Sequence, residues 1–439
     1  MKQRVLVVGV VLCALAAGLG WTGHLRARAS EARARQEEAV AARAVETAAA
    51  ERDRAIATFQ RRAAADPYSA IDLSWLASLY LRRARETGST ADYVSAEKAA
   101  RSSLALRVAH NTATYQTLAA SLVAQHRFAE ARDAARRLVE SDPEDPSFLA
   151  MLGEIEMELG DYDAAKPVFE ALGAAKPRLS VLPRLARWHE VSGRTPEARK
   201  LLHRARDEAV GRADLPAEQV AWYHFRVGDL ELRDGELEPA ERAFRAGLTV
   251  NPGDYRLLAA LARLEAARHD WEAAARYGEE AIAAVLDPAT LGVVSDAYAA
   301  LGDSVRAREL VKVMELSAFH EGEPLHRPWG LFFLDHGLHV GRVAAEAAEE
   351  VRGRRDVYGY DLLAWALHKQ GKHVEARAAM RRALRMGTQD ATLFFHAGMI
   401  ERALGDRRAA REHLERALEL NPHFHPTQPD QARRALESL

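Results

Sequence analysis

A period of 34 residues constrains this chain more than any other feature of its sequence. Tyr115 is matched by Leu149, and Pro143 is matched by Pro177, in both cases at a separation of 34 residues. Apolar and small residues between them recur at the same offsets, which chance rarely supplies at so many positions. A repeat of this length is typical of an array of supersecondary units, in which each unit buries its apolar surface only by stacking on its neighbours.

The clearest copy of the repeat runs from Ala391 to Pro422. Its first half carries apolar residues at the spacing of a helix, Gly405 and Asp406 interrupt the pattern, and a second apolar stripe follows. The unit is therefore predicted to form two short helices that are joined by a turn and closed by Asn421. Small residues lie where two helices would have to approach closely, at Gly398, Ala410 and Ala417.

This pattern resembles the tetratricopeptide repeat, in which about 34 residues carry a bulky residue, then Leu and a small residue, and later Ala, Phe, Ala and Pro. The resemblance covers residues 36–425 and is blurred between residues 319 and 355, where Pro324, Pro328 and Gly330 lie close together. It implies an all-α fold, a right-handed α–α superhelix or solenoid of about ten helix-turn-helix units. The concave face of such a solenoid is built mainly from the first helix of each unit.

Four segments follow from the pattern. We expect residues 70–425 to form the solenoid and residues 426–439 to form a polar helix that caps its last apolar face. Residues 30–69 are rich in Ala, Arg and Glu, and are predicted to be helical with a degenerate first repeat. Residues 1–29 are predicted to be a signal peptide or an N-terminal membrane anchor.

The prediction for the N-terminus rests on an uncharged apolar run, residues 5–20, that follows Lys2 and Arg4. Its length lies between the roughly 7 to 15 residues of a signal peptide core and the roughly 17 to 25 of a spanning helix. Ala27 to Ala29 has the small-x-small form of a cleavage site, so cleavage and retention both stay open. We expect an extracytoplasmic location, periplasmic or secreted, or attachment to a bacterial-type membrane through this segment. Positive charges after the run oppose export, at Arg26, Arg28, Arg33 and Arg35.

Composition excludes several classes of function. The net charge of -2, from 61 basic and 63 acidic residues, gives no reason to expect a nucleic-acid partner. Cys13 is the only cysteine and lies in the apolar run, so the folded part has no disulfide and no thiolate metal site. Gly18, Gly20 and Gly23 match GxGxxG, but they end an apolar run instead of opening a βαβ unit. Without a catalytic or cofactor motif, neither enzyme activity nor a cofactor is expected.

Histidines suggest an alternative class of function. Ten of the 17 lie between His320 and His425, including His336 with His339 and His423 beside His425. Imidazole is a common ligand of zinc and copper, so this region could belong to a metal-binding protein or an enzyme. Two-residue clusters without cysteine partners are more often surface or turn histidines, and no metal ligand is assigned.

The concave face supplies the candidate binding residues. In the family that the sequence resembles, ligand-contacting side chains project from the second, fifth, ninth and twelfth places of the first helix. The period maps these places onto Gln116, Glu154, Arg187, Trp222, Phe225, Asp229, Arg263, Asp296, Tyr358, Asp361, Trp365 and Phe395. The face is mixed in charge, and each aromatic residue could instead pack between neighbouring repeats. No unit carries the Lys and Asn pair with which some family members grip a chaperone's C-terminal carboxylate.

These observations predict a non-catalytic scaffold that binds a protein or peptide partner on its concave face. A binding surface does not name its ligand, so the partner itself is not predicted. The aromatic group formed by Tyr358, Trp365 and Phe395 is the sharpest part of the hypothesis. An exposed Trp365 would be a binding residue, whereas a buried Trp365 would stabilise the fold.

Overall fold

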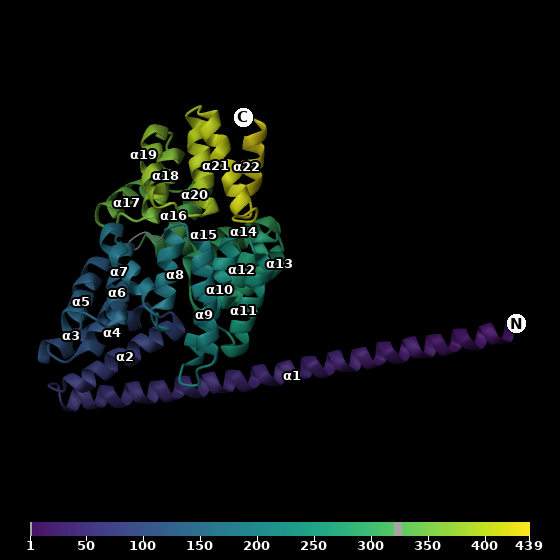
Figure 1. Ribbon diagram of the computed structural model, residues 1–439, viewed down its shortest axis with the longest axis horizontal. Helices are drawn as coiled ribbons and strands as arrows, with labels where there is room; N and C mark the ends of the chain where they lie inside the picture. Colours follow the sequence, from purple (N-terminus) through teal and green to yellow (C-terminus); the bar gives the residue numbers. More distant parts are fainter. Residues whose placement is uncertain (1, 320–326) are drawn as a thin grey trace.

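The computed structural model describes residues 2–319 and 327–439, and for residues 2–31 and 34 it describes only the backbone. His320, Pro324 and His326, in the stretch where the repeat pattern blurs, lie outside the described residues. Throughout the described ranges the regular structure is helical, which confirms the predicted all-α fold (Figure 1). The helices are α1 (Lys2–Ala65), α2 (Ala70–Thr87), α3 (Thr90–Leu106), α4 (Thr112–Ala124), α5 (Phe128–Ser141), α6 (Pro146–Glu158), α7 (Tyr162–Ala174), α8 (Leu182–Val191), α9 (Thr195–Val210), α10 (Ala217–Arg233), α11 (Leu237–Val250), α12 (Tyr255–Ala267), α13 (Trp271–Ala284), α14 (Pro288–Ala300), α15 (Ser304–Ala318), α16 (Arg327–Asp335), α17 (Val340–Gly353), α18 (Val357–Lys369), α19 (His373–Ala383), α20 (Ala391–Ala403), α21 (Arg407–Leu420) and α22 (Gln428–Glu437).

Helices α2 to α21 pair into ten hairpins within the described ranges, which confirms the predicted solenoid of helix-turn-helix units. Every hairpin turns through a residue with positive φ, which ends the first helix in the left-handed conformation. Glycine supplies this residue in eight turns, and His126 and His269 supply it in the other two, at φ 56° and 62°. The break at Gly405 that the sequence pattern located is one of these turns, at φ 80°.

Aspartates begin many of the helices. Their side chains accept hydrogen bonds from backbone N–H groups in the first turn, which would otherwise lack a partner. Asp145 at α6 and Asp390 at α20 are examples, with bonds of 2.7 Å to the N–H of Ser147 and 2.9 Å to that of Thr392. Each such cap stabilises its helix by about 1 kcal/mol, so the helix starts are encoded locally.

Small residues set how closely the two helices of a hairpin approach. A Cβ atom added to Gly153 would lie 3.1 Å from Val168 Cγ1, and one added to Gly398 would lie 2.6 Å from Leu414 Cγ. Gly228 is packed in the same way against Phe244. These contacts explain why the repeat places small residues at these positions.

The hairpins wind into two stacked layers (Figure 1). We call helices α2 to α15 the lower layer and helices α16 to α22 the upper layer. The contact between successive superhelical turns, which we call the seam, joins residues far apart in the sequence. Thr388 donates its hydroxyl to Val191 O at 2.5 Å across 197 residues, and Asn421 donates its amide to Leu232 O at 3.0 Å across 189 residues.

The seam has a regular chemistry. Backbone carbonyls at the C-terminal ends of first helices lack partners within their own helix. Loops of the upper layer supply the missing donors, as the Arg355 N–H does to Leu159 O at 2.9 Å and the Arg385 guanidinium does to Gly160 O at 2.7 Å. In an open solenoid each unit contacts only its neighbours. The structure differs from that expectation because successive turns of its superhelix contact each other.

Helix α1 is continuous through residues 30–65, so the degenerate first repeat does not form a hairpin. Near its C-terminal end, Ile56 is buried beside Phe59 in the core around α2, and buried Arg52 forms an ion pair with Glu86. Residues 5–20, the predicted leader core, lie outside the residues whose side chains are described. Elsewhere in the described chain no helix combines the length and the apolar character needed to cross a membrane.

The C-terminal helix α22 lies against α20 and α21. Its small apolar face, Ala432 and Ala435, is buried in the same cluster as Leu414 and Ala417 of α21. Helix α22 therefore covers apolar residues of the last hairpin and exposes Asp430, Arg433, Arg434 and Glu437 at this end.

Candidate functional site

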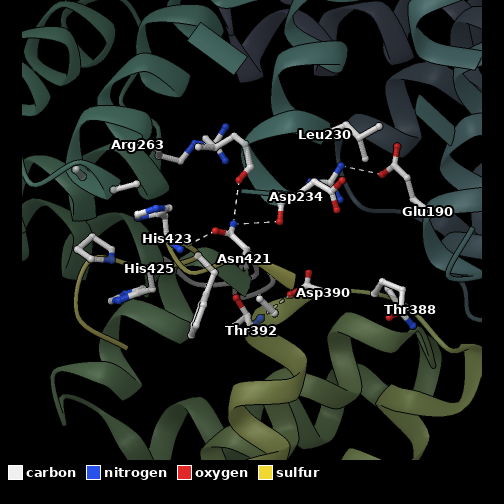
Figure 2. Close-up of a pocket in the computed structure, with 18 of the residues that line it drawn as sticks. Glu190, Leu230, Asp234, Arg263, Thr388, Asp390, Thr392, Asn421, His423 and His425 are labelled. Atoms are coloured by element: carbon white, nitrogen blue, oxygen red, sulfur yellow. Dashed lines mark hydrogen bonds and ion pairs between the residues drawn. The ribbon is translucent and has the colours of Figure 1, made fainter. Parts of the chain in front are cut away.

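A cavity of about 290 Å³ lies between the two layers (Figure 2). The lower layer contributes residues of the first helices α8, α10, α12 and α14 and the start of α9. The upper layer contributes the starts of α16 and α18, the start of α20 with the loop before it, and the loop after α21. Its charged and polar lining comprises Glu190, Thr195, Arg233, Asp234, Arg263, Asp296, Arg327, Tyr358, Thr388, Gln389, Asp390, Thr392, Asn421, His423 and His425.

Glu190 is the most heavily bonded charge in the lining. It is buried, and its carboxylate accepts bonds from Arg226 and Arg233, each at 2.8 Å, and from Arg187 at 3.2 Å. Burial alone would raise the pKa of Glu190, but these three guanidinium groups hold that pKa well below its usual range. The carboxylate is therefore ionised, and it fixes three arginine side chains of α8 and α10.

A second carboxylate, Asp229, extends this network to α12. It lies 3.1 Å from an Arg263 guanidinium nitrogen and 3.3 Å from one of Arg233. Burial opposes ionisation of Asp229, yet the neighbouring arginines, led by Arg233, lower its pKa. The prediction had placed Asp229 and Arg263 on one face, and the structure brings them into direct contact.

Tyr358 joins the two layers at one side of the cavity. The guanidinium of Arg187 from the lower layer lies 5.2 Å from the centre of the Tyr358 ring, and that of Arg327 from the upper layer lies 4.9 Å from it. Both distances suit cation–π attraction. Arg187 and Tyr358 were predicted residues, whereas Arg327 was not.

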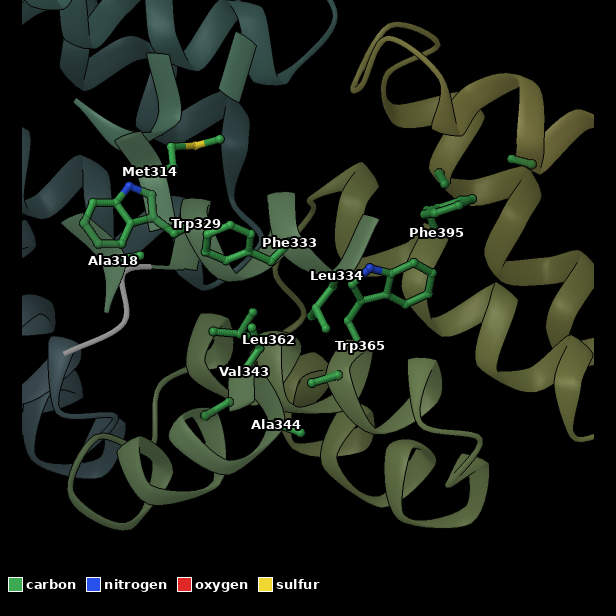
Figure 3. Packing of buried hydrophobic residues seen from close by; sticks show 14 of the residues in the cluster. Met314, Ala318, Trp329, Phe333, Leu334, Val343, Ala344, Leu362, Trp365 and Phe395 are labelled. Carbon is green, nitrogen blue, oxygen red and sulfur yellow. The ribbon is translucent and has the colours of Figure 1, made fainter. Parts of the chain in front are cut away.

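Asp361, Trp365 and Phe395 do not lie on an exposed face. Their exposed fractions are 0%, 2% and 0%, which contradicts their prediction as contact residues. Trp365 lies among buried apolar residues of the upper layer, including Leu334 and Phe395 (Figure 3). Its indole donates to Asp335 at 2.8 Å and stacks on His396 at 4.1 Å.

Asp361 is held in the same packed region. It accepts bonds from His396 Nδ1 at 2.6 Å and from Arg327. Burial would raise its pKa, but His396 and Arg327 lower that pKa to about 2. These residues are structural because α16, which comes from the stretch where the repeat pattern blurs, covers the face of α18.

The remaining predicted residues are dispersed. Asp296 lines the cavity and is bound by His336 Nε2 at 2.9 Å. Glu154 pairs with Arg184 at 2.7 Å, and Trp222 packs edge-on against Tyr223 at 5.1 Å. Phe225 lies against Phe244, and Gln116 is half-buried on α4. Apart from Asp296, none of these five lines the cavity.

Several lining residues were missed because they belong to helix ends and loops. Asn421 had been noted only as the end of a repeat. In the structure its amide donates to Leu232 O and Arg233 O, at 3.0 and 3.1 Å, and its carbonyl accepts from the His423 N–H at 2.7 Å. No local pattern marks Asn421 as a bridge between layers, because its acceptors lie nearly half the chain away.

The histidine pairs of the alternative hypothesis do not converge on one point. His336 binds Asp296 of α14, whereas His339 binds Glu315 of α15 at 2.7 Å. His425 lies beside the cavity, and burial lowers its pKa. Over the described ranges no group of three or more His, Cys, Asp or Glu side chains is arranged to hold a metal ion.

Comparison with known proteins identifies the repeat. Two family models of the tetratricopeptide repeat match the chain, one over residues 117–178 and the other over residues 391–424. No curated protein matches the chain significantly.

Three solved structures are similar to the chain. One is PilW, a widely conserved type IV pilus biogenesis factor, with 18% identity and a TM-score of 0.39 over 48% of this chain and 96% of that one. Another is Pseudomonas aeruginosa PilF, with 16% identity and a TM-score of 0.38 over 51% and 97%. The third is the APC/C hetero-tetramer Cut9-Hcn1, with 13% identity and a TM-score of 0.34 over 90% and 95%. All three TM-scores are low, so these likenesses support no inference about function.

Proposed function

Since the chain is a tetratricopeptide repeat protein, as its pattern predicts and two family models confirm, we propose that it is a non-catalytic scaffold that binds a segment of a protein partner. The observation that carries this proposal is the cavity between the layers, because ion pairs hold lining side chains of both layers in place, Arg233 and Arg263 in the lower layer and Arg327 in the upper layer. Its volume of about 290 Å³ lies just below the roughly 300 to 1,000 Å³ that is usual for small-molecule pockets. It suits one or two inserted side chains better than a cofactor.

The lining indicates the character of the inserted segment. Leu230, Val293 and Phe424 form apolar wall beside the charged network. Glu190, Arg233 and Arg263 are already in ion pairs, so a charge inserted beside them would have to displace an existing pair. An apolar side chain flanked by polar main chain fits this surface best, and half-exposed Tyr358 and Arg263 would provide the aromatic and guanidinium anchors that are common at binding hot spots.

We propose further that the N-terminal segment delivers the chain to the extracytoplasmic side or holds it at a membrane. The sequence supports this through the apolar run of residues 5–20. Helix α1 has 64 residues, a length of about 96 Å, and it extends well beyond the repeats (Figure 1). A helix of this form would hold the cavity away from a membrane surface. Cell fractionation with protease accessibility tests the location, and recovery in the cytoplasmic fraction would contradict it.

Site-specific photo-crosslinking in the native host tests the partner proposal. A photoreactive residue at Thr392 in the cavity should capture one defined protein, and Arg263→Ala should reduce that capture. The same probe at exposed Glu280 on α13 is the matched control. Equal capture of the same protein from both positions, or capture that Arg263→Ala leaves unchanged, would contradict binding in the cavity.

A further inference from the structure

The hairpin turns fall into two groups according to what covers them. In the first group the seam covers the turn: a Cβ added to Gly88 would lie 2.5 Å from Val285 Cγ2, and one added to Gly235 would lie 3.0 Å from Asn421 Oδ1. Gly160 is packed against the backbone of Arg355 at less than 3.0 Å. These turns belong to the first superhelical turn.

In the second group the turns are uncovered. For Gly302, Gly337, Gly371 and Gly405, no atom of the described residues lies within 4 Å of an added Cβ. Their φ values, from 69° to 87°, are those of the covered turns, so the backbone presents the same kind of surface. We call the surface formed by these four turns the upper edge.

Side chains beside the turns add apolar surface to the upper edge. Tyr162, the first residue of α7, is 6% exposed, and its hydroxyl accepts a bond of 2.9 Å from the Val357 N–H across the seam. On the upper edge, Val305 and Val374 are the second residues of α15 and α19, and they are 58% and 71% exposed. The upper edge therefore leaves two large apolar side chains in solvent beside its uncovered turns.

The opposite side of the solenoid carries the complementary surface. Loops between hairpins of the second superhelical turn provide the other half of the seam, but the loops at residues 66–69 and 107–111 belong to the first superhelical turn and have no preceding turn to cover them. Tyr68, Ile71 and Trp75 beside the first loop are 82%, 58% and 57% exposed, and Val108 in the second is 66% exposed.

These two loops and the start of α2 form one continuous surface, which we call the lower edge. Ile71, Trp75 and Arg107 line a shared hollow of about 170 Å³. Clusters of large apolar side chains left in solvent are typical of interaction surfaces.

We infer that the upper edge of one copy binds the lower edge of a second copy, so that the chain associates head to tail. A second copy is inferred as the binding partner because the seam already joins the same two kinds of surface, hairpin turns and the loops between hairpins, within one molecule. In the described chain, the hairpin turns of the upper edge have no loops packed on them, and the loops of the lower edge have no hairpin turns packed on them. Such a contact joins two different surfaces, so it generates rings or open filaments instead of a symmetric pair. The inference does not depend on a ligand in the cavity.

Two charge-introducing variants of the full chain test the inference, with detergent present to disperse the N-terminal apolar segment. Ile71→Arg with Trp75→Arg blocks the lower edge, and Val305→Arg with Val374→Arg blocks the upper edge. All four positions are exposed, so the melting temperature of each variant should match that of the original chain. Light scattering across a concentration series should show association of the original chain and a shift of about tenfold or more in either variant.

Mixing the two variants provides the decisive measurement. Each retains the edge that the other has lost, so an equimolar mixture should form a complex of two chains and no larger species. Glu280→Arg on α13 is the matched control and should associate like the original chain. A monomeric original chain, association that neither variant weakens, loss through the lower-edge variant alone, or a mixture without pairs would each overturn the inference. The last two results would instead indicate a symmetric contact or a different partner for the exposed apolar residues.

Discussion

Gly160 and Gly371 occupy the same place in their hairpins and have the same φ of 76°, yet their surroundings are opposite. Gly160 is pressed against the backbone of Arg355, whereas no described atom approaches the Cβ position of Gly371. The difference arises because the superhelix has a further turn above Gly160 and none above Gly371. Units with equivalent sequences therefore contribute differently to stability, depending on whether the seam covers them. A nearest-neighbour description of a solenoid counts only contacts between successive units and does not include contacts across the seam.

The largest difference in the free energy of unfolding is expected between variants of two tryptophans. Trp365 is 2% exposed and hydrogen-bonded to Asp335, whereas Trp75 is 57% exposed on the lower edge. Trp365→Ala should lower the free energy of unfolding by about 3 to 5 kcal/mol, because it leaves a cavity in the upper layer. Trp75→Ala should lower it by about 0.5 kcal/mol or less. Urea denaturation at low protein concentration checks both values, and similar losses would refute the assigned difference in packing.

The two glycines provide the next contrast. An alanine in the left-handed conformation costs about 1 to 2 kcal/mol at either position. At Gly160 the added Cβ also meets the carbonyl of Arg355, so Gly160→Ala should cost about 3 kcal/mol in total. Hydrogen exchange at the Arg355 amide, which is bonded to Leu159 O, should accelerate in Gly160→Ala and stay unchanged in Gly371→Ala. If both variants left this amide equally protected, the seam would not be the source of the difference.

Asn421 tests the seam through a single side chain. Asn421→Ala removes the side-chain donor to the carbonyls of Leu232 and Arg233, of which Leu232 O keeps the Gly235 N–H at 3.2 Å, and should cost about 2 kcal/mol. Asn111 is the matched control, because its amide donates locally to Ser103 and the Arg107 carbonyl. Photo-crosslinking yield from Thr392 should change in Asn421→Ala alone, since only that variant loosens the cavity wall. An equal change in Asn111→Ala would contradict this assignment.

The smallest effect is expected from pH. Burial lowers the pKa of His336, but the hydrogen bond and the charge of Asp296 raise that pKa by more than burial lowers it. The folded-state pKa therefore lies above the ordinary value of 6.5. The stabilisation is therefore complete below about pH 6.5 and is lost as pH rises through the folded-state pKa. The His336 side chain is 41% exposed, so the contribution should stay below about 0.5 kcal/mol. Melting temperatures between pH 6 and 8 should show this dependence in the original chain and not in Asp296→Asn.

Part of the site was accessible from the repeat pattern. Arg187, Asp229, Arg263, Asp296 and Tyr358 were placed on the inner face by their position in the first helix, and all five line the cavity or contact its lining. The pattern predicts these residues because the first helix of each repeat has the same orientation in the solenoid, so equivalent positions in successive first helices face the same side. It failed for the lining residues in loops, whose neighbours depend on the next superhelical turn.

The sequence by itself determined the units of this protein. Helix spacing, aspartate caps and turn glycines act over a few residues, and small residues such as Gly153 set contacts within one hairpin, so all of these can be read locally. The tertiary structure alone decided which turns are covered, where the cavity forms and that Trp365 is buried. These outcomes depend on a small rotation between successive units that accumulates over nearly 200 residues, as the separation of Thr388 and Val191 shows. No local pattern encodes that accumulated rotation, and α16 covers Trp365 from a stretch where the repeat pattern is blurred.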